Sequence, residues 1–427
     1  MKVLILTYYW PPAGGSGVQR WLKFVKYLPS YGIDPVVYTV DQANYPILDA
    51  QLATDIPEGI VVLKQPIKEP NRWLAPFKKS KPTSAGFLAK NPSLMGRIAQ
   101  YIRANFFIPD ARMFWIKPSV RYLTDYIQTH QIELVISSGP PHSLHLIAQQ
   151  LKEALGVKWI ADFRDPWTQI DYFHQLPLTK KSLHKHQQLE AGVLNAADHV
   201  LVVGEQMKNQ YAPQAKAISV ITNGFDDAKV PDNLALDTEF SLVHIGMLNA
   251  DRNPIALWKA LQKLSENDPE FSRRTRVKLI GKIAPEVVES IATYQLTALV
   301  DVIAYVTHEE ALKLQRQAQV LVLAINKVPS AKGIITGKIF EYLQADRPIL
   351  AIAPVDGDLA KIMEETQAGS VYDFNDEHGI ETQLTEWFTQ FKQGELMRVS
   401  ATIEQYHRKR LTENLVNVIQ RVCANVD

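Results

Sequence analysis

The sequence contains one cysteine, Cys423, among 427 residues. A single thiol excludes a disulfide framework and any site in which several cysteines hold a metal. It is in keeping with a reducing compartment. No apolar run approaches the roughly 18 residues that a membrane-spanning helix needs, and the apolar start, Met1–Thr7, is too short for the core of a signal peptide. We therefore expect a cytoplasmic protein, either free or peripheral at the inner face of the membrane.

An excess of charge of either sign is also lacking, since 46 Lys and Arg residues oppose 45 Asp and Glu residues. No global field attracts a polyanion, so nucleic acid is not expected as a partner. The histidines do not form a recognisable metal motif either. His142 and His145 form one pair and His184 and His186 another, but neither pair has a third ligand nearby. A catalytic metal is therefore not expected.

Strands alternate with helices along most of the chain, and the alternation occurs in two series. The first series begins with a fully apolar run, which is typical of a central parallel strand. The expected strands are 3–6, 35–40, 134–138, 157–163 and 199–203, then 241–245, 277–280, 302–305, 320–324, 348–352 and 370–372. This pattern predicts two parallel sheets, each covered by helices on both faces. We place the halves at 1–230 and 231–398, with the boundary near Asp226–Glu239 and a last helical segment, 399–427, that can cross back to the first half.

One segment, 65–118, interrupts the alternation and is rich in proline, basic residues and aromatic residues. Its aromatic residues are Trp73, Phe77, Phe87, Tyr101, Phe106, Phe107, Phe114 and Trp115. Insertions of this kind lie on the surface and often carry function. Two interpretations stay open. The segment is either a solvated helical insertion or lid, or a contact with a membrane surface or lipid acceptor through basic groups and interleaved aromatics.

A glycine-rich loop, Pro11–Gly17, follows the first strand. The amides of Gly14 and Gly15 can approach a ligand at a positive helix N-terminus; the alternative is a tight turn that requires glycine. The loop begins a dinucleotide fingerprint, but Arg20 occupies the third glycine position and opposes close helix–strand packing. Because Asp41 still resembles a ribose-binding acid, NAD binding is weakened rather than excluded.

Polar residues follow two later strands of the first half. His142 comes after a Gly-Pro-Pro turn at the carboxyl end of a strand, the edge at which open α/β sheets bind ligands. A helix-capping or solvated histidine is the alternative. Asp162, Arg164 and Asp165 end the next strand. Two carboxylates around an arginine either orient a hydroxyl-rich ligand or form an ion-pair network that fixes the loop.

The second half carries basic residues near two helix starts. Gly246 ends a strand, and Arg252 comes just before a helix, a position that suits a diphosphate. Gly337, Lys338 and Glu341 lie on one side of a later helix. Lys338 and the preceding amides can meet phosphate, while a carboxylate such as Glu341 can accept from both hydroxyls of a ribose. A plain surface pair between Lys338 and Glu341 is the alternative.

Together these motifs resemble the retaining nucleotide-sugar glycosyltransferases of the GT-B fold, glycosyltransferase family 4 in particular. Residues 8–15 resemble the family's N-terminal Gly-Gly loop, 245–252 its strand–Gly–Arg–Leu…Lys segment, and 338–351 its nucleotide-binding helix and the strand after it. The resemblance covers nearly the whole chain, in the right order. It implies an α/β fold of the GT-B type, in which two Rossmann-like, doubly wound parallel-sheet domains face a central cleft and the C-terminal domain holds the nucleotide.

The resemblance also implies roles for single residues. The implied donor-nucleotide contacts are Gly14, Gly15, Gly246, Arg252, Gly281, Val306, Gly337, Lys338 and Glu341. The catalytic candidates are His142, Arg252 and Lys338. The candidates for the acceptor or donor-sugar side are Asp162, Arg164 and Asp165. Positive potential would stabilise the departing nucleoside diphosphate. The resemblance implies no metal and no other cofactor, and it assigns no protein nucleophile.

The chain departs from the family pattern at two positions. Met247 stands where the family usually has a phosphate-binding arginine, so one positive contact is lost. Gly333 stands where the family's Glu-x7-Glu motif has its earlier glutamate, which contacts the donor sugar. A subgroup with Lys-x-x-Glu-Tyr-Leu in this helix resembles the chain more closely.

We therefore expect transfer of a hexose, with retention, from a UDP- or GDP-type donor to a glycan or lipid-linked acceptor in cell-surface polysaccharide biosynthesis. A nucleotide-sugar epimerase of the same fold is the nearest rival, with Asp162, Asp165 and His142 as acid and base groups. A non-catalytic scaffold is a second rival, motivated by Gly333 and Met247.

Overall fold

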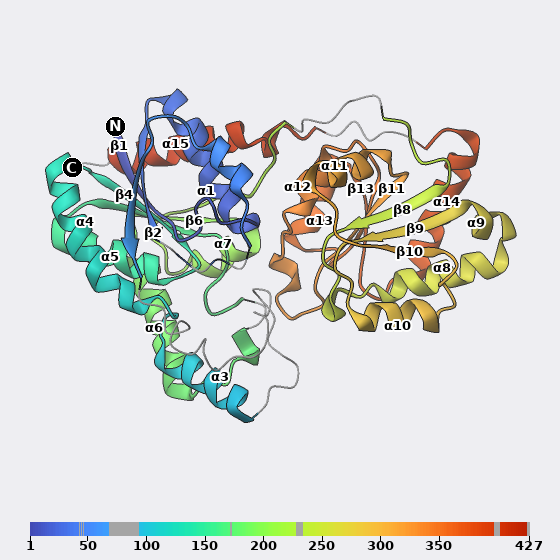
Figure 1. The fold of residues 1–427 in the computed structure, drawn as a ribbon, viewed down its shortest axis with the longest axis horizontal. Coiled ribbons are helices and arrows are strands. Elements are labelled where there is room, and N and C mark those ends of the chain that lie inside the picture. The colour runs from blue at the N-terminus through green and yellow to red at the C-terminus, as the bar shows by residue number, and fades with distance from the viewer. Residues whose placement is uncertain are drawn as a thin grey trace. The chain divides into compact units, whose positions relative to one another are not determined.

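The computed structural model describes residues 1–41, 43, 45, 47–67, 94–170, 173–227, 234–396 and 402–424. The chain divides into two compact units (Figure 1). Unit 1 consists of Met1–Asn223 and Arg408–Asp427, and unit 2 of Gly224–His407. The division falls a few residues before the expected boundary, and the last helix belongs to unit 1. Of the aromatic residues singled out in the 65–118 segment, Trp73, Phe77 and Phe87 lie outside the described residues.

Unit 1 is built on a seven-stranded sheet with the order β3-β2-β1-β4-β5-β6-β7. Its strands are β1 (Lys2–Leu6), β2 (Asp34–Asp41), β3 (Val61–Pro66), β4 (Leu134–Gly139), β5 (Lys158–Phe163), β6 (His199–Val202) and β7 (Ile218–Val220). All neighbouring strands are parallel, and Ile5 of β1 pairs with Val37 on one side and Ile136 on the other. The connections run outward in both directions from β1 and β4, which makes the sheet doubly wound.

Helices cover both faces of this sheet, so its central strands are buried and largely apolar, apart from polar side chains near the carboxyl ends of β4 and β5. The helices are α1 (Ser16–Tyr27), α4 (Ile116–His130), α5 (Ser143–Leu155), α6 (Lys180–Ala196), α7 (Glu205–Tyr211) and α15 (Arg408–Ala424). A further helix, α3 (Leu94–Phe106), packs against α6. Val3 and Ile5 of β1 pack with α1 and α15, which lie side by side in Figure 1. Leu4 and Leu6 point to the opposite face and pack with α4, α5 and α6.

Unit 2 repeats the plan with a six-stranded parallel sheet of order β10-β9-β8-β11-β12-β13. Its strands are β8 (Phe240–Ile245), β9 (Thr275–Ile280), β10 (Val300–Ile303), β11 (Val320–Ala324), β12 (Ile349–Ile352) and β13 (Gly369–Tyr372). Its helices are α8 (Ile255–Asn267), α9 (Pro269–Arg274), α10 (Pro285–Thr293), α11 (His308–Gln317), α12 (Lys338–Leu343), α13 (Asp358–Thr366) and α14 (Glu377–Gln393). One face packs on α8, α10 and α14, and the other on α11, α12 and α13.

The two sheets confirm the expected fold of two Rossmann-like, doubly wound parallel sheets. Every expected strand occurs, with ends that shift by up to two residues. Two strands were not expected, β3 and β7, and both lie at sheet edges. Within the described ranges, no helix has both the length and the apolar character that a bilayer crossing demands.

Candidate functional site

Two glycines end neighbouring strands of unit 2 in a backbone conformation that side chains rarely adopt. Gly246 follows β8 with φ of 121°, and Gly281 follows β9 with φ of 122°. The Gly246 amide donates to Ile280 O at 2.7 Å, and the Gly281 amide to Ile303 O at 2.9 Å. A Cβ at Gly281 would lie 2.7 Å from Gly246 O. Both positions therefore require glycine, and together they form a bare backbone surface at the carboxyl edge of the sheet.

Lys338 extends its side chain over this surface. A Cβ at Gly246 would lie 2.2 Å from Lys338 Nζ, so the ammonium occupies the space that a side chain would fill. Withdrawal from water lowers the pKa of Lys338 to about 8, and the positive charge of Arg252 lowers it further than Glu341 raises it. The lowered pKa means that nearby negative charge does not compensate the Lys338 ammonium, so this position favours an anionic ligand.

Arg252 lies at the point where the strand order of unit 2 reverses. It ends a short 3₁₀ turn after β8, and its Nε donates to Asn326 Oδ1 at 3.1 Å, just beyond the neighbouring strand β11. Its Nη1 also donates to Met247 O at 3.3 Å. Ligands of open α/β sheets bind at this switch point. The Arg252 guanidinium therefore lies beside Met247, the position at which the family usually has an arginine.

Helix α12 is fixed to the end of β8 and presents Glu341. The Ile245 amide donates to the Tyr342 hydroxyl at 3.0 Å, and Tyr342 is buried. Glu341 is half-buried, and Gln315 Nε2 of α11 donates to its Oε2 at 3.4 Å. Before the helix, a Cβ at Gly337 would meet open space. Val306, after β10, is half-buried, while its neighbour Tyr305 is exposed.

The structure thus brings together most of the unit 2 candidates. The residues connected by these contacts are Gly246, Arg252, Gly281, Lys338 and Glu341. Gly337 adjoins them in the chain, and Val306 follows the strand whose end accepts from Gly281. Within the described ranges, no group of three or more His, Cys, Asp or Glu side chains is placed to hold a metal ion.

The glycine-rich loop of unit 1 is partly occupied by its own chain. The Gly14 amide donates to Ile47 O at 2.9 Å, and a Cβ at Gly14 would lie 2.8 Å from Ile47 Cγ2. This amide is therefore already paired. Gly15, with φ of 88°, caps α1 and stands at the N-terminus of that helix. The tight-turn interpretation explains Gly14. Gly15 stands at the N-terminus of α1, where its amide can still contact a ligand.

His142 lies in a shell of aromatic residues at the end of β4. Its ring stacks on Trp167 at 4.5 Å with an interplanar angle of 2°. Burial, with added effects from His145, His186 and Arg164, lowers the pKa of His142 well below its usual value. Its Nδ1 has no hydrogen-bond partner among the described residues. His142 is therefore a neutral imidazole with an unused ring nitrogen.

Arg164 joins three strand ends of unit 1. Its amide donates to Gly139 O at 3.1 Å, its Nη1 donates to Gly17 O at 2.8 Å, and its guanidinium lies 5.4 Å from the centre of the Tyr9 ring. Asp165 is half-buried and lies 3.6 Å from Arg164 Nε. The Asp165 side chain is 45% exposed and that of Arg164 is 12% exposed, so Asp165 is the more accessible of the two at the carboxyl edge.

Comparison with known proteins adds the family. Residues 17–229, about half of the chain, match the sequence model of glycosyltransferase family 4. A glycosyltransferase from Rickettsia africae is similar in structure with a TM-score of 0.63 and 13% identity, covering 99% of both chains. HepE from Anabaena, solved in complex with UDP, gives a TM-score of 0.60 and 13% identity over 99% of this chain and 100% of that one.

The chain is a GT-B-fold glycosyltransferase of the family 4 type. A putative UDP-N-acetylglucosamine 2-epimerase from Listeria monocytogenes shares the fold, with a TM-score of 0.55 and 11% identity over 100% of this chain and 97% of that one. Likenesses this distant establish the fold alone. No significant similarity to a curated protein is found.

One candidate of this glycosyltransferase is corrected by the structure. Asp162 is fully buried, and its carboxylate accepts from Arg20, Trp21 and Ser138. Burial alone would raise the pKa of Asp162, but the Arg20 guanidinium and the other donors hold it below its usual value. Asp162 therefore stabilises the core and is not available to a sugar hydroxyl. The expected ion pair exists, but its partner is Arg20 rather than Arg164.

Several residues near the site were not singled out from the sequence. Asn326, just after the apolar strand β11, accepts a hydrogen bond from Arg252. A polar residue that closely follows an apolar strand could have been predicted from the sequence to lie at the site. Trp167 holds the His142 ring, and its own Nε1 donates to His186 Nδ1 at 3.1 Å. His244 is buried beneath the unit 2 site, where burial and the charge of Lys338 lower its pKa to about 3.

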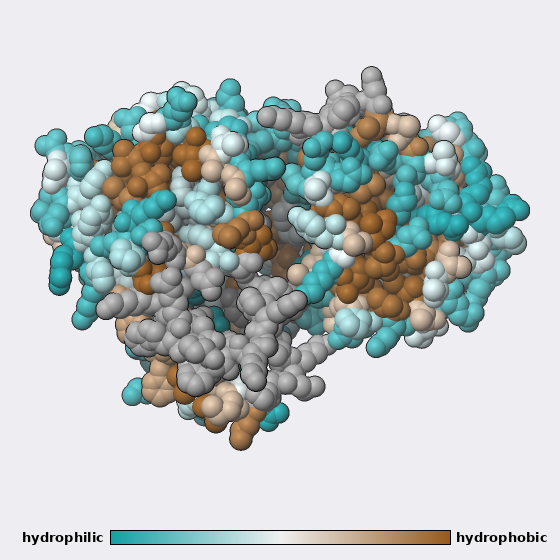
Figure 2. Space-filling model, in the orientation of Figure 1, coloured by the Kyte–Doolittle hydropathy of each residue, from teal (hydrophilic) through white to brown (hydrophobic). Residues whose placement is uncertain are grey.

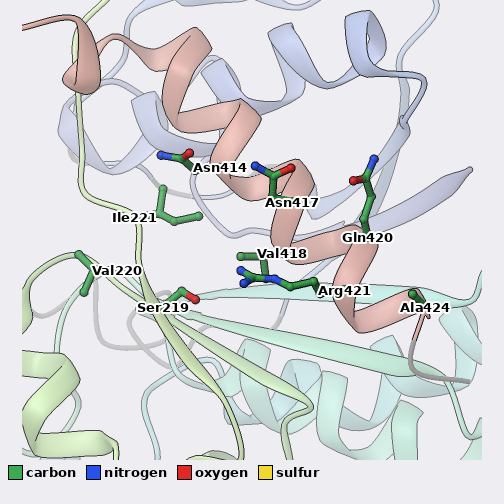
Figure 3. Close-up of a pocket in the computed structure, with 9 residues that line it drawn as sticks. All are labelled: Ser219, Val220, Ile221, Asn414, Asn417, Val418, Gln420, Arg421 and Ala424. Atoms are coloured by element: carbon green, nitrogen blue, oxygen red, sulfur yellow. The ribbon is translucent and has the colours of Figure 1, made fainter.

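A groove of about 660 Å³ lies elsewhere in unit 1, between β7 and α15 (Figure 3). It is lined by Ser219, Val220, Ile221, Asn414, Asn417, Val418, Gln420, Arg421 and Ala424. None of these is a candidate site residue. The groove therefore gives no support to the expected donor or acceptor contacts.

Proposed function

We propose that the chain transfers a hexose, with retention, from a UDP- or GDP-type donor to a glycan or lipid-linked acceptor in cell-surface polysaccharide biosynthesis. The proposal places the enzyme in the cytoplasm, at the inner face of the membrane. The observation that carries the donor assignment is the Lys338 ammonium, which lies over the bare backbone of Gly246 and close enough to Arg252 for its pKa to fall. Two like charges near one another at a sheet switch point are stabilised by a diphosphate between them.

In this proposal unit 2 binds the nucleotide. Arg252 and Lys338 contact the diphosphate, and the positive potential they supply stabilises the departing nucleoside diphosphate as its charge develops. Glu341 accepts from the ribose hydroxyls, since its carboxylate is half-buried and only weakly held by Gln315 at 3.4 Å. In the proposal Gly246 and Gly281 give backbone contacts beside Lys338, whose ammonium fills the space over Gly246. The proposal also gives Gly337 a backbone contact and Val306 a place beside the base.

Unit 1 supplies the sugar and acceptor side in this proposal. His142 contributes a neutral imidazole, which hydrogen-bonds sugar hydroxyls without adding charge. Arg164 and Asp165 remain as polar contacts for acceptor or donor sugar, whereas Asp162 does not. Gly15 keeps its assignment to the donor pyrophosphate, and Gly14 contributes the turn. No metal takes part.

The buried state of Asp162 bears on the rival activity. An epimerase reading needs Asp162, Asp165 and His142 as acid and base groups, and the first of these is neutralised by Arg20. A scaffold without catalysis needs no cationic pocket at a strand switch point. Both rivals make different predictions for ligand binding and products.

Calorimetric titration with UDP, GDP, ADP, CMP and NAD, first without metal and then with Mg²⁺, tests the donor assignment. We expect one nucleoside diphosphate to bind, with no gain from Mg²⁺. Glu341→Ala should weaken that binding while the matched control Glu289→Ala, an exposed glutamate on α10, leaves it unchanged. Binding of NAD alone, or of no nucleotide, would contradict the proposal.

Incubation with nucleotide-sugars of the selected nucleotide, together with a glycan or lipid-linked acceptor fraction, then tests the reaction. We expect release of the nucleoside diphosphate and formation of a glycoside with the same anomeric configuration as the donor. Mass spectrometry detects the product, and NMR determines its configuration. An epimerised nucleotide-sugar without transfer would identify an epimerase instead. Nucleotide binding without turnover on any acceptor fraction would identify a scaffold.

A further inference from the structure

Helix α3 of unit 1 exposes an apolar face. Leu94, Ile98, Tyr101 and Ile102 follow the spacing i, i+4, i+7 and i+8, which places them on one side of the helix. The exposed apolar side chains of α3 are 44 to 75% accessible: Leu94, Met95, Ile98, Tyr101, Ile102 and Phe106. Figure 2 shows apolar residues gathered where Figure 1 places this helix. A contiguous patch of this kind marks an interaction surface rather than a solvated one.

Basic residues border this face on the neighbouring helix. Asn105 of α3 donates from Nδ2 to Pro177 O and accepts from the Thr179 amide, both at 2.8 Å. These bonds hold the end of α3 against the start of α6, where Lys180, Lys181 and Lys185 are exposed. On α3 itself, two arginines flank the apolar stripe, and both are exposed.

Acidic residues are absent from α3 and from the start of α6, and Glu190, further along α6, is buried. None occurs from Leu94 to Phe106 or from Phe173 to Leu189. The patch is therefore apolar at its centre and positive at its border, with no carboxylate to repel an anion. An interfacial helix bound to anionic lipid has this composition, because its apolar side chains enter the acyl boundary while its cations contact the headgroups. A protein partner would have to offer a matching apolar groove with an acidic rim.

We infer that α3, together with the start of α6, docks unit 1 onto a membrane surface that contains anionic lipid. The inference rests on the proposed function in one respect, since it brings the enzyme to the place where a lipid-linked acceptor lies. It adds the elements that make the contact, the class of lipid and the contribution of the α6 lysines. The nucleotide site in unit 2 has no part in it.

Co-sedimentation of the full chain with phosphatidylcholine vesicles, with or without phosphatidylglycerol, tests this inference. We expect binding that requires phosphatidylglycerol and weakens as salt shortens the screening length from about 10 Å to about 3 Å. Replacing Lys180, Lys181 and Lys185 together by Gln should weaken binding on the order of 100-fold, at about tenfold or less for each cation.

Two further variants separate the apolar contribution from the electrostatic one. Ile98→Gln/Ile102→Gln removes two exposed aliphatic side chains that the inference places in the lipid contact, and it should also weaken binding on the order of 100-fold. Val288→Gln/Val302→Gln is the matched control, because both valines are exposed β-branched residues of unit 2. It should bind vesicles like the unchanged protein. UDP and GDP titration of each variant reports the nucleotide site separately, so loss of lipid binding with intact nucleotide affinity is expected.

Three results would overturn the inference. Equal binding to vesicles without phosphatidylglycerol would contradict the electrostatic contribution. No vesicle binding by the unchanged protein would contradict the docking surface, whatever the nucleotide titration shows. A dimer detected by light scattering, and dissociated by Ile98→Gln/Ile102→Gln, would assign the face to a second copy of this chain.

Discussion

The affinity for a nucleoside diphosphate should fall as pH rises through 8, because Lys338 loses its charge there. The pKa of Lys338 in the free protein is about 8, compared with an ordinary value of 10.5. Contact with a diphosphate favours the charged form and returns the pKa toward its ordinary value. Protonation of Lys338 falls from about 90% at pH 7 to about 10% at pH 9, so affinity should drop about tenfold, or about 1.4 kcal/mol.

Calorimetry in buffers of different ionisation enthalpy measures this directly. Proton uptake on binding should rise from about 0.1 per site at pH 7 to about 0.9 at pH 9. The phosphates of the ligand are already ionised across this range, since their last pKa lies near 6. Lys338→Arg keeps a charge at every pH in this range and should abolish the pH dependence. Constant affinity from pH 7 to 9 in the unchanged protein, without proton uptake, would refute contact between Lys338 and the diphosphate.

The same lowered pKa predicts an effect on stability, and its sign is opposite to that of a paired lysine. Between pH 8 and 10.5 the unfolded chain binds more protons than the folded one, so the free energy of unfolding rises with pH in that window. Below pH 8 Lys338 is charged in both the folded and the unfolded chain, so the folded chain bears the full cost of burying that charge. Lys338→Met should therefore stabilise the fold at pH 7, by about 2 kcal/mol after allowing for partial exposure, and the gain should vanish near pH 10.5. Denaturant titration at both pH values measures it.

Three further tests separate core positions from site positions. Asp162→Asn leaves the Arg20 guanidinium buried without its anion and should cost about 3–5 kcal/mol in denaturant unfolding, with nucleotide affinity unchanged; weaker binding without loss of stability would return Asp162 to the site. Gly281→Ala should cost at least about 2 kcal/mol, because it combines an unfavourable φ with a contact to rigid backbone, whereas Gly337→Ala should change stability by less than about 0.5 kcal/mol. Trp167→Leu removes the ring that orients the His142 imidazole and should lower kcat about tenfold or more at unchanged nucleotide affinity; full activity, or failure of Trp167→Phe to restore it, would contradict that positioning role.

The sequence predicts the central strands well because both faces of each sheet are covered. A strand such as β1 is then a continuous apolar run, and its boundaries are visible without any knowledge of its neighbours. The two edge strands lack that signal. β3 is only partly buried and ends at Pro66, and β7 has three half-buried residues. Partial exposure removes the apolar run, so only pairing with a neighbour defines these strands.

The site is predictable in unit 2 and less so in unit 1, for a related reason. Lys338 and Glu341 lie within one helical turn, so spacing alone places them together. Asp162 and Arg20 are 142 residues apart, and only the folded chain shows that helix α1 carries a guanidinium to the underside of the strand end. The carboxylate pattern around Arg164 was visible in the sequence, but the burial of its first member was not.

Two buried charge arrangements in this protein therefore have different meanings. Arg20 and Asp162 neutralise each other at 2.8 Å, and their side chains are 1% and 0% exposed, so the pair is complete without a ligand. Lys338 is set near Arg252, and its lowered pKa shows that the folded protein does not fully compensate its charge. An arrangement that costs stability persists when another state of the protein relieves it. In the proposed function a bound diphosphate does so. This argument favours the edge of the unit 2 sheet over Gly14 of unit 1, whose amide already has its acceptor.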